Sequence, residues 1–353
     1  DDGLWYEGSL GYHRYTMEAL WPLAEAARGA GIDLYTDRYR TLYDAPLALA
    51  LPNGDPPGFN DSAGSNLATY GPLYEIAAAR WDRPAYGRLL SHTTRDTLQA
   101  LLWGPETVPS GPMIPQESTL LAKAGFAVLR GPGMAVAVRF GMHGGGHGHP
   151  DKLGIVTFAR GQLFGLDPGS INYGVPLHRE WYRSTIAHNT VAVDQQPQAN
   201  ADGTLEQWTG TSLTATAGEV YPGVTLRRIL TLREGRLEDR FECASDAEHT
   251  YDWAFHAPGR FTSSLTFQPR ATPLAASNGY QHIEKPAAAG ADTDWWARWE
   301  NGNARWTLRM KGAPGTEVFT GVAPGKNPTE RIPLVIVRRR AAATAFEASH
   351  QVE

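Results

Sequence analysis

Over residues 1–108, apolar side chains recur at the three- and four-residue spacing of amphipathic helices. The first predicted helix ends at Gly29 and contains Pro22, which is expected to interrupt or kink it. Its apolar face comprises Tyr12, Tyr15, Ala19, Leu23 and Ala26. Further helices are predicted over 38–51, 67–81 and 86–102, with a turn-rich loop over 52–62 between the first two of these.

After a proline- and glycine-rich stretch over 104–116, the apolar period changes to two. The runs 126–130 and 134–140 flank Gly131-Pro132-Gly133, which predicts a hairpin. Further strand-like runs cover 153–159, 162–166, 190–193, 224–232, 237–243, 306–310 and 334–338. Many short strands between Gly/Pro turns are typical of an antiparallel sandwich. The order predicts an α+β protein with a helical domain over 1–108, a linker over 109–117 and a β-sandwich over 118–353.

Composition narrows the possible partners. Hydrophobic residues make up 42% of the 353 residues and charged residues 20%, as in globular proteins with a full core. The formal net charge of −5 offers no general basic field, so nucleic acid is not expected as a partner and anions must be bound locally. No run of about 18 apolar residues occurs, so no membrane span is expected. The oligomeric state is left open.

The single cysteine, Cys243, excludes an internal disulfide and a cysteine-based metal site. The chain begins without methionine and without a signal-peptide pattern. We therefore expect a fragment or processed chain whose targeting segment is absent.

The segment 142–153 concentrates candidate chemistry in a glycine-rich loop between two predicted strands. Its ionisable groups near the glycines are His143, His147, His149 and Asp151. Asp167 and His188 follow at strand edges. Imidazole and carboxylate ligands without thiolate suit Zn²⁺, with water completing a tetrahedron. The alternative is that these groups only form hydrogen bonds within turns.

Three other segments combine polar and aromatic residues. His13 and Arg14 lie beside Tyr12 at a helix start, where they could neutralise a carboxylate or simply satisfy the helix terminus. Asn60-Asp61-Ser62 precedes Tyr70 and Tyr74, although a tyrosine on an apolar helix face is usually core. The segment 178–184 is dense in ionisable groups, and burying so many is costly. This cost favours a site there.

Together these segments resemble the heparinase II/III superfamily of polysaccharide lyases, especially the alginate and heparin exolyases of families 15 and 17. The most specific parts are His-Gly-His-Pro-Asp at 147–151 and Ala-His-Asn-Thr at 187–190. Members pair an incomplete (α/α) toroid with an antiparallel β-sandwich. They are normally longer, with more helices upstream, so the resemblance implies that residues 1–108 are the C-terminal portion of a toroid.

The resemblance also implies site roles. His13 would face the substrate carboxylate, Tyr70 would be the catalytic tyrosine with Tyr74 as a rival, and His147 and Tyr182 would complete the catalytic set. The residues expected to contact substrate are Tyr12, Arg14, Tyr74, Trp181 and Arg183. The residues that fall where the family places zinc ligands are His149, Asp167 and His188. Many members have Asn beside the first histidine, where this chain has Tyr12 and Arg14.

The implied activity is β-elimination on a uronate-containing polysaccharide, such as alginate, heparin or heparan sulfate, leaving a 4,5-unsaturated end. Tyr70 is expected as the acid, and Tyr182 or His147 as the base. The zinc would be structural, and the protein periplasmic or secreted, with a cytoplasmic location possible.

Three alternatives are a toroid glycoside hydrolase using Glu7 and Asp61, a non-catalytic carbohydrate-binding module, and a metal-dependent hydrolase. The last of these would be built on His147, His149, Asp167 and His188.

Overall fold

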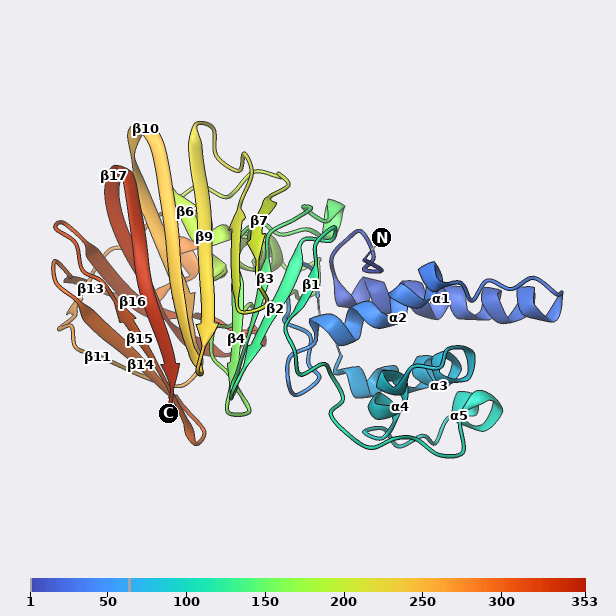
Figure 1. Ribbon diagram of the computed structural model, residues 1–353. Helices are drawn as coiled ribbons and strands as arrows, with labels where there is room; N and C mark the ends of the chain where they lie inside the picture. Colours follow the sequence, from blue (N-terminus) through green and yellow to red (C-terminus); the bar gives the residue numbers. More distant parts are fainter. Residues whose placement is uncertain (1, 63–64) are drawn as a thin grey trace.

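A computed structural model describes residues 2–62 and 65–353. It places a group of helices beside a large antiparallel β-structure (Figure 1), which confirms the α+β class. The α-helices are α1 (Leu10–Gly29), α2 (Asp37–Leu49), α3 (Gly71–Arg80), α4 (Pro84–Leu90) and α5 (Leu98–Trp103). Shorter helical turns are η1 (Leu67–Tyr70), η2 (Gly145–His147), η3 (His178–Tyr182), η4 (Thr185–Ala187) and η5 (Tyr280–His282).

Local capping explains most of the helix boundaries. The side chain of Ser9 accepts a hydrogen bond from a first-turn amide of α1, and α1 continues through Pro22 to Gly29. The predicted helix over 86–102 is wrong, because the chain forms α4 and α5 with a break between them. Arg95 in that break has a positive φ of 52°, and the Thr97 side chain caps α5 anew.

The strands form two antiparallel sheets. The five-stranded sheet runs in the order β1 (Thr119–Leu121), β2 (Phe126–Gly131), β3 (Met134–Arg139), β4 (Ile155–Ala159) and β5 (Gln162–Leu163). The main path of the twelve-stranded sheet is β11 (Arg260–Ser263), β14 (Trp295–Asn301), β15 (Ala304–Met310), β17 (Arg331–Val352), β10 (Arg236–His256), β9 (Val224–Arg233), β8 (Ser212–Thr216) and β7 (Thr204–Trp208). Off this path lie β6 (Val191–Val193), β12 (Gln268–Pro269), β13 (Glu284–Gly290) and β16 (Glu317–Pro324).

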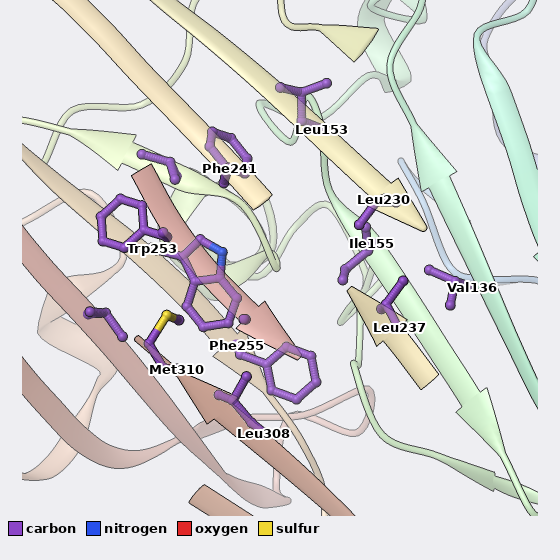
Figure 2. Packing of buried hydrophobic residues seen from close by; sticks show 14 of the residues in the cluster. Val136, Leu153, Ile155, Leu230, Leu237, Phe241, Trp253, Phe255, Leu308 and Met310 are labelled. Carbon is purple, nitrogen blue, oxygen red and sulfur yellow. The ribbon is translucent and has the colours of Figure 1, made fainter. Parts of the chain in front are cut away.

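The core lies between the two sheets. Figure 2 shows Val136 and Ile155 of the smaller sheet facing Leu230, Trp253 and Phe255 of the larger one. Burial of these apolar side chains is the main stabilising contribution to the sandwich. The thiol of Cys243 is buried in the same cluster, and burial raises its pKa.

Helices and sheet are joined by a shared apolar cluster and by one partly buried cation. The cluster packs Leu49 and Phe59 against Phe126 and Val156. The guanidinium of Arg130 in β2 donates to the backbone oxygens of Ala48 and Ala50 at the end of α2, at 2.8 and 2.9 Å. Among the described residues, no helix is both long and apolar enough to cross a membrane.

Candidate functional site

The candidate site lies where loops of the helical part meet loops of the β-structure. The loop between β3 and β4 carries His147 and His149, and its tight course depends on glycine. A Cβ on Gly148 would lie 1.9 Å from the carbonyl oxygen of His143, and one on Gly144 would lie 2.5 Å from that of Glu7. Gly144 also has a φ of 93°, which side chains rarely adopt.

The carboxylate of Asp61, from the loop after α2, is the centre of this junction. Its Oδ2 lies 3.0 Å from Nδ1 of His147, and its Oδ1 lies 3.0 Å from Nε2 of His149 and 3.1 Å from Nε2 of His178. The Ser170 hydroxyl donates to Oδ1 at 3.0 Å. Burial raises the pKa of Asp61, but the hydrogen bonds and charges of the histidines outweigh burial and hold this pKa well below its usual range.

An open cleft lies against this centre. Its volume is about 530 Å³, and its lining includes Tyr12, Tyr15, Asp61, Ser170 and Tyr173. The ring of Tyr12 stacks on His147 with centroids 3.8 Å apart. The hydroxyls of Tyr12 and Tyr173 are 2.6 Å apart, and that of Tyr173 lies 3.3 Å from Nδ1 of His147. Two of the tyrosines that line the cleft, Tyr12 and Tyr173, therefore contact the imidazole of His147.

Two buried groups of His and Asp residues could hold a metal, each with ligand atoms within 4.8 Å of one another. The first contains Asp61, His149 and His178; the second contains Asp151, Asp167 and His188. The three predicted zinc ligands are thus divided between the groups. The groups adjoin, because the rings of His149 and His188 have centroids 5.4 Å apart.

The donor atoms at this boundary fit a cation. Within the described part of the chain, Nδ1 of His149, Nε2 of His188 and Oδ2 of Asp151 are buried without a hydrogen-bond partner. A buried polar atom left unsatisfied costs about 1–3 kcal/mol. Nδ1 of His188 lies 2.9 Å from Oδ2 of Asp167. Imidazole nitrogen and carboxylate oxygen are a ligand set suited to zinc.

Several residues predicted for the site point elsewhere in the structure. His13 is fully buried, with Nε2 2.7 Å from the Leu42 oxygen, and burial lowers its pKa to about 4. The Tyr70 hydroxyl donates to the Leu10 oxygen at 3.1 Å, and burial raises its pKa to about 12. The Tyr74 hydroxyl is also buried and donates to a backbone oxygen of α2 at 2.6 Å.

Two side chains of the segment 178–184, those of Trp181 and Tyr182, also point into the protein interior. The Tyr182 hydroxyl donates to the Gly325 oxygen at 2.7 Å, and burial raises its pKa to about 12. The Trp181 indole donates to the Pro324 oxygen at 3.0 Å. Arg183 instead donates to the backbone oxygens of Gly146 and Gly148, so it stabilises the loop between β3 and β4 that carries His147.

Arg14 lies on the exposed side of α1. It pairs with Glu18 at 2.8 Å, and its guanidinium lies 5.0 Å from the ring centroid of Tyr70. Of the predicted catalytic and substrate-contacting residues, Tyr12 therefore lines the cleft and His147 stacks against its ring. Arg183 adjoins them through the loop.

Sequence reasoning missed Tyr173 as a site residue and did not identify Asp61 as the partner of three histidines. Tyr173 is 48% exposed and lies in a loop without periodicity, six positions after the predicted ligand Asp167. Two features of the sequence could have indicated Tyr173: its closeness to Asp167 and the neighbouring turn residues Pro168, Gly169 and Asn172. Such turns position functional side chains.

The hydrolase pair Glu7 and Asp61 can also be located. Oε1 of Glu7 is 3.8 Å from Nε2 of His147, and Asp61 contacts the opposite ring nitrogen. The imidazole therefore stands between the two carboxylates. A hydrolytic acid needs a raised pKa, whereas the pKa of Asp61 is lowered.

Comparison with known proteins defines the class. Residues 113–336 match the family described as Heparinase II/III-like, C-terminal, and the chain belongs to this family. An alginate lyase from Stenotrophomonas maltophilia (strain K279a) is 28% identical, over 49% of this chain and 28% of that protein.

Solved structures share the fold. The heparan sulfate lyase HepC from Pedobacter heparinus superposes with a TM-score of 0.75 at 16% identity, covering 99% of this chain and 53% of that one. A crystal structure of heparinase III gives a TM-score of 0.71 at 16% identity, covering 100% of this chain and 54% of that one. The chain thus spans about half the length of these structures.

Proposed function

We propose that this protein is a polysaccharide lyase that cleaves a uronate-containing polysaccharide by β-elimination. The observation that carries this proposal is the cluster of His147, Tyr12 and Tyr173 at the open cleft. Membership of the heparinase II/III family supports it. The substrate class is alginate or a glycosaminoglycan, since the alginate lyase relative and the heparinase structures act on such polymers by name.

Elimination needs one group that takes a proton and another that gives one. In the proposed step, Nε2 of His147 takes the proton from C5 of the uronate. The electron pair of that C–H bond becomes the C4=C5 double bond, and the bond from C4 to the glycosidic oxygen breaks. The Tyr173 hydroxyl then gives its proton to the leaving oxygen. Proton exchange with solvent restores both groups.

The surroundings of Tyr173 suit the role of acid. Burial raises the pKa of its phenol, and the hydrogen bond with Tyr12 and the charge of Asp61 raise it further. The phenol therefore keeps its proton until the leaving oxygen develops negative charge. Tyr12 is positioned by its stacking on His147 and can orient both groups. In this proposal Tyr173 takes the place that the sequence resemblance gave to Tyr70 as the acid.

For the metal, we propose zinc held by His149, Asp167 and His188 at the boundary of the two buried groups. Their unpartnered nitrogens support this assignment. A zinc ion bound there supplies cross-linking of three β-domain segments. His147 lies two residues before the first of these ligands, so the cross-link would stabilise the β-domain segment that carries it.

The test is incubation of the full-length protein with alginate, heparin, heparan sulfate and hyaluronan while ultraviolet absorbance by the new double bond is followed. We expect absorbance to rise with one of these polymers. Tyr173→Phe should lower kcat by about 10²–10⁴-fold, the range for loss of a general acid. The matched control Tyr221→Phe removes a hydroxyl that donates to the Gln196 oxygen, away from the cleft, and should leave kcat within about twofold.

Tyr182→Phe separates the structural assignment from the sequence resemblance, because its hydroxyl donates to a buried backbone oxygen. If Tyr182→Phe removes activity while Tyr173→Phe keeps it, the assignment of Tyr173 is wrong. If no polymer yields an unsaturated product with the folded wild-type protein, the lyase proposal itself is wrong.

A further inference from the structure

The carboxylate of Asp61 is contacted by side chains from several segments of the β-domain. Three histidines of the β-domain and the Ser170 hydroxyl converge on it, and its side chain is only 2% exposed. Its backbone is held as well: its N–H donates to the His147 oxygen at 3.0 Å, and its carbonyl accepts from Ser9 at 3.0 Å. The carboxylate is therefore fixed in place.

We propose that Asp61 is a positioning residue that sets opposite tautomers in two histidines, so that one is ready as the cleft base and the other as a metal ligand. This inference rests on the proposed function for the role of His147 as base. The tautomers themselves follow from the geometry around Asp61 and can be tested without any activity.

The argument begins with hydrogen-bond chemistry. An ionised carboxylate only accepts hydrogen bonds, so each imidazole nitrogen that faces it must carry a proton. His147 faces Asp61 with Nδ1, at 3.0 Å. Its Nε2 therefore has a free lone pair, and the nearest carboxylate to that atom is Glu7, 3.8 Å away. A neutral imidazole in this tautomer can take a proton at Nε2.

His149 faces the same carboxylate with the other nitrogen. Its Nε2 is 3.0 Å from Oδ1 of Asp61, so Nε2 carries the proton and Nδ1 has the lone pair. That Nδ1 is buried and has no hydrogen-bond partner among the described residues. An imidazole that donates one N–H to a carboxylate and offers its other nitrogen to a metal is a recurrent arrangement around bound metals.

Asp61 thus links the cleft to the buried metal group through one side chain. It comes from the helical part, whereas His147 and His149 come from the β-domain loop between β3 and β4. Correct docking of the two parts is therefore required before His147 carries its proton on Nδ1, which leaves Nε2 free to act as the base. The same docking presents the free nitrogen of His149 to a metal.

The first experiment is a long-range ¹⁵N–¹H correlation spectrum of the uniformly labelled wild-type protein, in which the two ring nitrogens of each neutral histidine identify its tautomer. His147→Gln and His149→Gln variants assign the signals. We expect the Nδ1–H form at His147 and the Nε2–H form at His149. An Nε2–H form at His147 overturns the proposal, whatever the enzyme activity.

The second experiment replaces the carboxylate by the isosteric amide in Asp61→Asn. We expect kcat on the polymer to fall by about 10²–10⁴-fold with KM within about threefold, because a carboxylate that holds the base's tautomer acts on the chemical step. Zinc affinity, measured by competition with a chelating dye, should fall by about 10–100-fold, as for other groups that orient metal ligands.

The matched control is Asp202→Asn, which changes a carboxylate that accepts from the His143 amide of the same loop at 3.0 Å but does not contact His147. It should leave kcat and zinc affinity within about twofold. If Asp61→Asn keeps wild-type kcat and zinc affinity, Asp61 does not position either histidine. If Asp61→Asn does not fold, the tautomers of His147 and His149 in the wild-type protein decide whether the proposal holds.

The outcomes also separate this inference from the proposed function. A wild-type protein that forms no unsaturated product but shows the expected tautomers contradicts the lyase proposal and leaves the role of Asp61 in place. A wild-type lyase with the opposite tautomer at His147 contradicts the role of Asp61 alone.

Discussion

A buried ion pair in the β-sandwich yields the sharpest stability prediction. Nε and Nη2 of Arg228 in β9 contact the two carboxylate oxygens of Asp239 in β10 at 2.9 and 2.5 Å. Both side chains are 0% exposed. Nη1 of Arg228 also donates to the backbone oxygens of Leu153 and Asn189, at 2.6 and 2.7 Å. The pair therefore anchors two segments next to the metal groups.

Asp239→Asn leaves the guanidinium buried without its counter-charge. Breaking a buried pair by removing one partner costs about 3–5 kcal/mol, against a total stability of roughly 5–15 kcal/mol for a domain. At about 2–4 °C per kcal/mol for a domain of this size, the melting temperature of the β-sandwich should fall by ~10 °C. The double variant Asp239→Leu with Arg228→Met should recover most of this loss, because apolar replacement removes both desolvation costs.

The same pair predicts acid sensitivity. Burial raises the pKa of Asp239, but the attraction of Arg228 outweighs it and lowers this pKa to about 2. A folded pKa below the unfolded value means that the contribution is complete above about pH 4 and is lost as the pH falls towards 2. A difference of roughly two pH units corresponds to about 2.5 kcal/mol. This figure is smaller than the cost of Asp239→Asn because it covers only the ionisation of the carboxyl.

The assay is urea unfolding followed by circular dichroism at pH 7 and at pH 3. We expect the wild type to lose stability between these values and Asp239→Asn to lose about 1 kcal/mol less, because pH 3 lies between the folded and unfolded pKa values and only part of the contribution is lost there. If Asp239→Asn lowers the free energy of unfolding by less than ~1 kcal/mol at pH 7, the reasoning is refuted, since exposed pairs are worth that little. A double variant as unstable as the sum of the single variants would refute it too.

Three further predictions follow from the site and its supports. Gly148→Ala should lower kcat by more than ~10²-fold, because its Cβ would meet the His143 oxygen at 1.9 Å, whereas Gly146→Ala, with nothing within 4 Å of its Cβ, should stay within about twofold. Arg130→Met should destabilise the junction of helices and sheet by about 2–4 kcal/mol in urea unfolding, because it removes two bonds to α2 carbonyls. Removal of metal with a chelator should lower the melting temperature, with activity lost only as the β-domain unfolds; immediate loss from a folded protein would contradict a structural metal.

Much of the fold follows from periodicity, and the exceptions have physical reasons. The change of apolar period between α5 and β1 marks the order of helices and strands. The 21- and 22-residue strands β10 and β17 were predicted only as short runs, because the middle of β10 is mostly exposed and polar and the middle of β17 is made of arginines and alanines. Such residues carry no apolar alternation, and the strands continue through them because β10 and β17 pair on both sides of an irregularity between Ala244 and His249.

The candidate site was predictable in its residue types and less so in its geometry. The segment chosen from spacing contains His147, which contacts two of the cleft tyrosines, and Asp167 and His188 lie side by side in the structure. Spacing could not tell which way Tyr182 points, because its hydroxyl partner, the Gly325 oxygen, lies 143 positions later in the chain. It also could not show that Asp61 of the helical part would meet histidines from the β-domain. Such contacts arise only from the docking of the two parts.

The most direct test of the central account is mass spectrometry of the products formed in isotopically labelled water. The account predicts oligosaccharides that lack one water at the new non-reducing end and carry no oxygen label from the solvent, because elimination consumes no water. Products heavier by one water and carrying solvent oxygen would show hydrolysis and would contradict the account.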